Sequence, residues 1–346
     1  MRLFISALSA SLMMSGSVLA APKVVASIQP LHSLVAGVMD GVGTPELIVQ
    51  EASSPHGFSL KPSQARSLQQ SDIVFWVGHG LETFLEKPLE TVAADATTVE
   101  MLETPGLTKF GFRESDGFEA HDHDHDHGHG DHGHDDHGHD GHEHDDHDKT
   151  AKDDHDHDKE HSHDHDDKHE HDHSETDPHI WLDPQNAVKM VETIRATLSE
   201  NDPENAETYA ANAKALSQKL NDLDEQISAK MASSGKGNFI VFHDAYHYFE
   251  ARYGLEAAGS ITLNPENLPG AKRVRELQEK IKSLKVTCIF SEPQFDPKII
   301  TTVTEGLSTR TSTLDPLGAA LDPGKEQYFT LMENMANSFA ECISDG

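Results

Sequence analysis

Short apolar runs and helix-like stripes alternate along the first part of the chain. Three runs are apolar and rich in β-branched residues, which predicts strands at residues 24–28, 47–49 and 73–77. Apolar residues at helical spacing, and a proline suited to a first helical turn, predict helices at residues 31–39, 62–70 and 81–93. This alternation of strands and helices indicates a parallel α/β sheet.

The same alternation resumes after residue 238. The predicted strands are residues 239–242, 257–262 and 286–290, followed by a short strand that ends at Leu314. The predicted helices are residues 270–284, 297–307 and 324–343. These elements form a second α/β lobe, so the fold class is α/β with two lobes of parallel-type sheets flanked by helices.

Two helices are predicted between the lobes. The first covers residues 184–198, and the second carries one apolar stripe with intervals of three or four residues. The stripe consists of Leu216, Leu220, Leu223, Ile227 and Met231. A helix of roughly 30 residues with such a face is either a strut that joins two lobes or part of a coiled coil. The strut divides the chain into an N-terminal lobe (21–202), a linking helix (203–233) and a C-terminal lobe (234–346).

Residues 120–176 interrupt the pattern inside the first lobe. Between His121 and His173 there are 20 histidines, 21 acidic residues and 4 lysines, and apolar residues are almost absent. Such a segment cannot bury enough surface to fold, so we expect a disordered loop. Its imidazoles and carboxylates would bind several divalent ions weakly; the alternative is a solvated spacer. The whole chain has a net charge of −33, which argues against nucleic acid as a partner.

The N-terminus has the pattern of a secretory signal peptide. Arg2 precedes an apolar run over residues 3–14, and small residues lead to Ala20. We expect cleavage after Ala20 and export, since the run is too short to span a bilayer. In an oxidising compartment Cys288 and Cys342 are expected to form a disulfide, with two buried free thiols as the alternative.

Histidines outside the loop carry the candidate chemistry. His56, His179 and His243 each occur where a strand gives way to a loop, and Asp315 follows the last short strand. In open α/β sheets such strand ends face the ligand crevice. Three imidazoles and one carboxylate suit Zn²⁺ in tetrahedral coordination. The residues therefore predict a zinc site between the lobes.

Other interpretations of these residues remain open. His79 also follows a strand and would line the same crevice, whereas His32 and His247 lie in helical stretches and are expected to be structural. Three histidines with an open fourth position would suit a zinc hydrolase, with Glu82 or Asp244 as base. Gly-x-Ser-x-Gly is absent, and His-Glu-x-x-His does not occur outside the histidine-rich loop, so we do not expect an enzyme. A metal store built on the loop is the third possibility.

Six motifs spread over nearly the whole chain resemble those of the ZnuA-like zinc receptors of ABC importers. They lie at residues 26–32, 54–63, 179–184, 241–246, 291–295 and 313–317. The resemblance implies two α/β lobes joined by one long rigid helix, with the metal in the interlobe cleft. It assigns ligand roles to His56, His179 and His243 and implies a disulfide between Cys288 and Cys342.

The resemblance also implies the function. A receptor of this kind is periplasmic, captures Zn²⁺ and delivers it to a membrane permease driven by a cytoplasmic ATPase, while the histidine-rich loop collects further zinc. Family members have a carboxylate or solvent as fourth ligand, and we expect Asp315 here. Related manganese receptors have a glutamate where His243 stands, so the histidine favours zinc. We expect a monomer.

Overall fold

The computed structural model describes residues 21–50, 53–113, 176–263, 265–267 and 269–344. The predicted signal peptide (1–20) and the predicted loop, apart from Thr176, lie outside these residues. Among the helices that the structure describes, none combines the length and the apolar character that a membrane span requires.

The first sheet is built from four parallel strands in the order β2-β1-β3-β4. They are β1 (Val24–Ala26), β2 (Glu46–Leu47), β3 (Ile73–Trp76) and β4 (Thr97–Glu100). β1 and β3 are fully buried and paired in the centre, as their continuous apolar sequences predict. β4 was not predicted, because this edge strand begins with two exposed threonines, Thr97 and Thr98, and has no apolar run.

The second sheet repeats this topology with the order β6-β5-β7-β8, again all parallel. Its strands are β5 (Phe239–His243), β6 (Gly259–Thr262), β7 (Cys288–Ser291) and β8 (Arg310–Thr313). All four were predicted from the sequence, with small shifts at their ends. The prediction of two parallel sheets flanked by helices is therefore confirmed.

Helices cover the sheets and connect them. The α-helices are α1 (Gln29–Val38), α2 (Pro62–Gln69), α3 (Glu86–Thr91), α4 (Pro184–Asn201), α5 (Ala206–Ser233), α6 (His247–Tyr253), α7 (Ala271–Ser283), α8 (Lys298–Thr304) and α9 (Gln327–Ile343). Short 3₁₀ turns occur at η1 (Met101–Glu103), η3 (Ile180–Leu182) and η4 (Pro203–Asn205). α3 begins later than predicted. The backbone N–H groups of Val77 and Gly78 bond to the Glu82 carboxylate, and these bonds keep the residues before Glu86 in turns rather than in a helix.

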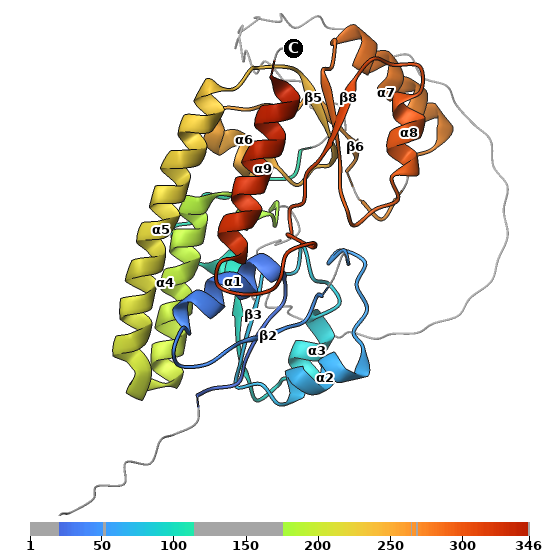
Figure 1. Ribbon diagram of the computed structural model, residues 1–346. Coiled ribbons are helices and arrows are strands. Elements are labelled where there is room, and N and C mark those ends of the chain that lie inside the picture. Colours follow the sequence, from blue (N-terminus) through green and yellow to red (C-terminus); the bar gives the residue numbers. More distant parts are fainter. Residues whose placement is uncertain (1–20, 51–52, 114–175, 264, 268, 345–346) are drawn as a thin grey trace, which may run out of the picture. The chain divides into compact units, whose positions relative to one another are not determined.

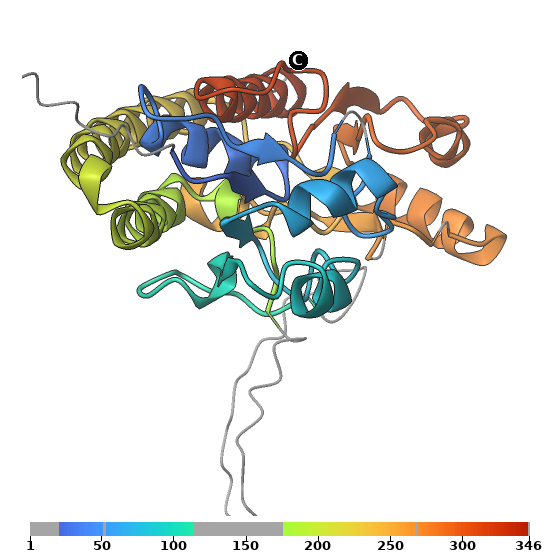
Figure 2. The same ribbon diagram turned by 90° about the horizontal axis from the view of Figure 1, so that it is seen from below.

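The long helix α5 has 28 residues, close to the predicted length. Its apolar stripe is buried inside this chain, where α5 contacts α1, α4, α6 and α9. These contacts favour the strut over the coiled coil, since α1 flanks the first sheet and α6 follows a strand of the second. α4 lies beside α5 in both Figure 1 and Figure 2.

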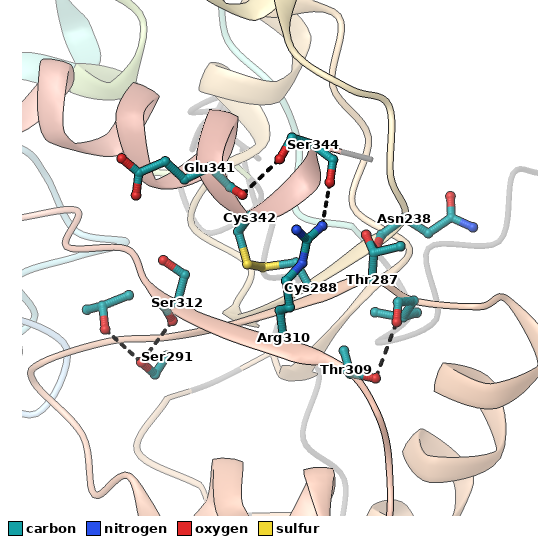
Figure 3. Close-up of a disulfide and its surroundings, with 12 residues drawn as sticks. Asn238, Thr287, Cys288, Ser291, Thr309, Arg310, Ser312, Glu341, Cys342 and Ser344 are labelled. Carbon is teal, nitrogen blue, oxygen red and sulfur yellow. Dashed lines mark hydrogen bonds between the residues drawn. A yellow bond between two sulfur atoms is a disulfide. The ribbon is translucent and has the colours of Figure 1, made fainter. Parts of the chain in front are cut away.

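The last helix fastens the second sheet to the rest of the fold. α9 contacts α1, α5 and β8, and the Tyr328 hydroxyl at its start donates to the Trp181 carbonyl (2.7 Å). Near its other end Cys342 is disulfide-bonded to Cys288 on β7, with 5.6 Å between the Cα atoms. Figure 3 shows this bond beside Arg310, which donates to the Ser344 carbonyl. The predicted disulfide is confirmed.

Candidate metal centre

Three histidines from distant parts of the chain converge at one pocket, although only His243 lies at the end of a strand as predicted. His56 lies in the loop after β2, His179 directly precedes η3, and His243 is the last residue of β5. The ring centroids are 5.3 to 5.6 Å apart, and one nitrogen of each ring lies within 4.8 Å of the others. Among the described residues, this is the one group of three or more potential metal ligands that close together.

Carboxylates orient two of the three rings. His179 Nδ1 lies 2.7 Å from Asp177 Oδ1, and His243 Nδ1 lies 2.7 Å from Glu292 Oε1. The Nε2 atoms of both rings consequently point at each other, 3.4 Å apart. A carboxylate on the far nitrogen of a histidine is the arrangement that fixes ring orientation in metal sites and makes the ligating nitrogen more basic.

The protonation of the cluster is uneven. Burial, together with the neighbouring His179 and His243, holds the pKa of His56 well below its usual value. Burial and His243 do the same to the pKa of His179. Burial also opposes charge on His243, but the attraction of Glu292 outweighs it and raises the pKa of His243. Two rings thus offer neutral nitrogen lone pairs, which is the form that binds a metal.

The walls of the site are mostly apolar and the space is small. The cavity has a volume of about 10 Å³, and its lining includes Leu81, Trp181, Phe295 and Leu317 beside the histidines. The Trp181 indole donates to the Pro316 carbonyl (2.8 Å), which fixes one wall. Pockets for drug-sized ligands start at about 300 Å³. The space and its donors suit a single ion better than an organic substrate.

Asp315 does not join the three histidines in this structure. Its Oδ1 accepts hydrogen bonds from Gln294 Nε2 (2.8 Å) and from the backbone N–H groups of Leu317 (3.2 Å) and Gly318 (2.9 Å). The carboxylate therefore shapes the turn after β8, next to two residues that line the pocket. Its role as fourth ligand stays a prediction.

The remaining histidines lie outside the cluster. The His79 side chain is 47% exposed, with Nδ1 3.2 Å from Glu86, and it does not line the pocket. His32 is buried in α1, where its Nε2 lies 3.0 Å from the Pro45 carbonyl, and His247 stacks on Phe110. The structural roles expected for His32 and His247 agree with these contacts.

Both acids considered as bases for a hydrolase are engaged elsewhere. Glu82 is fully buried and accepts hydrogen bonds from Ser27 and from the N–H groups of Val77 and Gly78. Asp244 forms a buried ion pair with Arg113. Both carboxylates therefore already have partners within the described part of the chain.

Sequence reasoning missed the two orienting carboxylates. Asp177 lies two residues before His179, so the spacing Asp-x-His contained a local signal. Glu292 is 49 residues from His243, and only the pairing of β5 with β7 brings the two together. The position of Glu292 at a strand end, and its place in the motif at residues 291–295, were the available signs of its role.

The sequence matches known proteins over nearly its whole length. The family model described as "Zinc-uptake complex component A periplasmic" matches residues 24–342. A relative from Brucella suis biovar 1 (strain 1330), named "High-affinity zinc uptake system protein ZnuA", is 50% identical over 331 residues, which cover 95% of this chain and 94% of the relative. A relative of the same name from Paracoccus denitrificans (strain Pd 1222) is 40% identical over 323 residues, covering 93% of this chain and 92% of the relative.

Solved structures share the fold. A crystal structure of ZnuA matches with a TM-score of 0.70 and 21% identity, covering 94% of this chain and 100% of that one. A laminin-binding adhesin from Streptococcus agalactiae matches with a TM-score of 0.68 and 19% identity, at the same coverage. At these identities the likeness supports the architecture alone.

Proposed function

Because the chain belongs to the periplasmic family of zinc-uptake complex component A, we propose that it is a periplasmic receptor that captures Zn²⁺ for an importer. The observation that carries the proposal is the convergence of His56, His179 and His243. Receptors for zinc uptake bind and release their ion and are not enzymes, which agrees with the engaged state of Glu82 and Asp244.

The donor set favours zinc over harder cations. Imidazole nitrogen is a common zinc ligand, whereas manganese and calcium prefer more oxygen. Tetrahedral zinc at about 2.0 Å from each nitrogen needs ligand nitrogens about 3.3 Å apart. The 3.4 Å between Nε2 of His179 and Nε2 of His243 fits this spacing. The apolar walls exclude water that would compete for the ion.

The fourth position is proposed for Asp315. Its described hydrogen bonds all end on Oδ1, so Oδ2 is the oxygen that can turn toward a metal while the loop keeps its bonds. Asp315→Asn keeps Oδ1 as an acceptor and removes the charge. We expect this variant to bind zinc more weakly than the wild type but more tightly than His243→Ala. If Asp315→Asn binds zinc as tightly as the wild type, the fourth ligand is solvent and not Asp315.

The partners follow from the family. We propose that the signal peptide at residues 1–20 directs export of the chain. The zinc-loaded receptor then docks on a membrane permease that is driven by a cytoplasmic ATPase. The histidine-rich loop would collect additional zinc. Both the loop and the signal peptide lie outside the described residues, so these parts rest on the sequence.

Calorimetric titration of the mature chain with zinc at neutral pH tests the proposal. We expect one tight site that His243→Ala abolishes. His79→Ala is the matched control, since it removes an exposed histidine outside the cluster, and it should keep the tight site. Tight binding that survives in His243→Ala would refute the assignment.

A second titration separates the receptor from the storage function. A chain lacking residues 121–173 should retain the tight site and lose only weaker ones. Loss of all tight binding in the shortened chain would assign the function to the loop.

A further inference from the structure

The two chain segments that flank residues 114–175 are hydrogen-bonded to each other. Gly111 and Thr176 form an antiparallel bridge, and the Asp177 N–H donates to the Phe110 carbonyl (2.9 Å). We call residues 110–113 and 176–177 the stem. Side-chain bonds between Asn186 and both backbone groups of Thr108 (2.8 and 3.0 Å) tie the approach to the stem to α4.

Several residues of α6 hold the stem, beginning with Tyr248. The Tyr248 hydroxyl accepts from the Phe110 N–H (3.2 Å) and donates to the Asp177 carbonyl (2.8 Å), so it bonds both arms. The Phe110 ring stacks on His247 at a centroid distance of 4.4 Å. These contacts hold the stem against the segment that directly follows β5.

Arg113 forms the strongest attachment. Its Nε lies 2.8 Å from Asp244 Oδ1, its Nη1 lies 2.9 Å from Glu250 Oε2, and its Nη2 contacts both carboxylates. The side chains of Arg113, Asp244 and Glu250 are 16%, 6% and 2% exposed. A planar guanidinium can bind two carboxylates in this forked manner, whereas an ammonium group cannot.

Each end of this arrangement adjoins one of the two buried histidines. On the stem, Asp177 binds the Nδ1 of His179. Across the ion pair, Asp244 is the residue after His243. Arg113 thus connects the segment that carries His179 to the segment that carries His243, although these histidines are 64 residues apart in the sequence.

We propose that Arg113 is a positioning residue that holds His179 and His243 at the spacing a metal ion requires. The inference rests on the proposed function and deepens it. Arg113 does not contact the ion. Without its fork, the stem and the strand end would be joined mainly through Tyr248, and the Nε2 atoms would be held less tightly.

The test compares Arg113→Ala with Arg195→Ala in the full mature chain. Arg195 also forms a forked pair, with Glu192, but on the exposed face of α4. Zinc affinity is measured by competition with a chelator, and the spectrum of bound Co²⁺ reports ligand geometry. We expect Arg113→Ala to raise the zinc Kd about 10- to 100-fold, as loss of outer-shell partners commonly does, and to change the Co²⁺ spectrum. Arg195→Ala should change neither.

Further variants guard against a folding defect. Arg113→Lys keeps the positive charge but cannot bind both carboxylates in a forked manner. Glu250→Gln weakens the carboxylate contact that lies away from the histidines. The zinc Kd of both variants should fall between those of the wild type and Arg113→Ala. A lower Tm with unchanged Kd and Co²⁺ spectrum in these variants would overturn the proposal. If the wild type itself lacks a tight site that His243→Ala removes, the proposed function fails. If the wild type has that site and the Arg113 variants bind zinc like the wild type, this inference fails alone.

Discussion

The buried carboxylate of Glu82 predicts a stability that falls as pH rises. Glu82 lies under the carboxyl edge of the first sheet, with no exposed surface. Its Oε2 accepts from the N–H groups of Gly78 (2.9 Å) and Val77 (3.1 Å), and its Oε1 contacts the Ser27 hydroxyl. Burial raises the pKa of Glu82 to about 7, although these hydrogen bonds oppose the increase.

The sign and size follow from proton linkage. The pKa of glutamate is raised from 4.5 to about 7 on folding, so between these values the folded state binds the proton more tightly than the unfolded state. The stabilisation is therefore complete below the unfolded pKa and is lost as pH rises through the folded pKa. Between about pH 5 and about pH 8 the loss from this one group is about 2.5 kcal/mol.

Glu82→Gln isolates this contribution. The glutamine amide can accept from the backbone N–H groups and donate to the Ser27 hydroxyl, as the protonated acid does, but it does not titrate. Urea denaturation followed by circular dichroism across this pH range should show the variant gaining about 2.5 kcal/mol relative to wild type as pH rises. Glu90→Gln, an exposed residue of α3, is the control. A constant difference between wild type and Glu82→Gln would refute the reasoning.

Three further predictions concern the site, the disulfide and the long helix. Glu292→Gln should weaken zinc binding about 10- to 100-fold in a chelator competition, because the uncharged amide no longer makes the His243 ring more basic; an unchanged Kd would contradict this. Replacing Cys288 and Cys342 by serine should lower the free energy of unfolding by about 4 kcal/mol, since their bond closes a loop over a separation of 54 residues. Leu220→Ala, at a fully buried position of α5, should cost about 2–5 kcal/mol in urea denaturation.

The sequence predicted the central strands and the three histidines because their signals are local. β1, β3 and β5 are buried on both faces and read as continuous apolar runs, which few other elements produce. A histidine at the end of such a run is then placed at the crevice by the topology of parallel sheets. Of the three histidines, this argument places only His243, because His56 lies in the loop after β2 and His179 directly precedes η3.

The missing parts depend on contacts across long sequence separations. Arg113 is 131 residues from Asp244, and no periodicity marks either residue. β4 is held by pairing with β3 rather than by its own composition. Asp315 was predicted as a ligand from its strand-end position, yet its Oδ1 accepts a hydrogen bond from the Gly318 N–H in the turn that follows. A single sequence does not distinguish this role from metal ligation.

The two sheets have equivalent strand orders, but the carboxyl ends of their two central strands have different roles. In the first sheet, the ends of β1 and β3 lie side by side, and the donors exposed there, from Ser27, Val77 and Gly78, are satisfied by Glu82. The crevice that a parallel sheet offers at this point is thus closed by a carboxylate of the chain itself.

In the second sheet, the neighbouring ends of β5 and β7 carry His243 and Glu292, so the same crevice holds the proposed ligand and the acid that orients it. Since the first sheet's crevice is closed, its half of the site must come from loops beyond the strands, where His56 and His179 lie. His243 is thus fixed by backbone pairing, whereas the position of His179 depends on Asp177 and the segment around it. This asymmetry is the physical reason why a side chain such as Arg113 is needed to set the distance between the two halves.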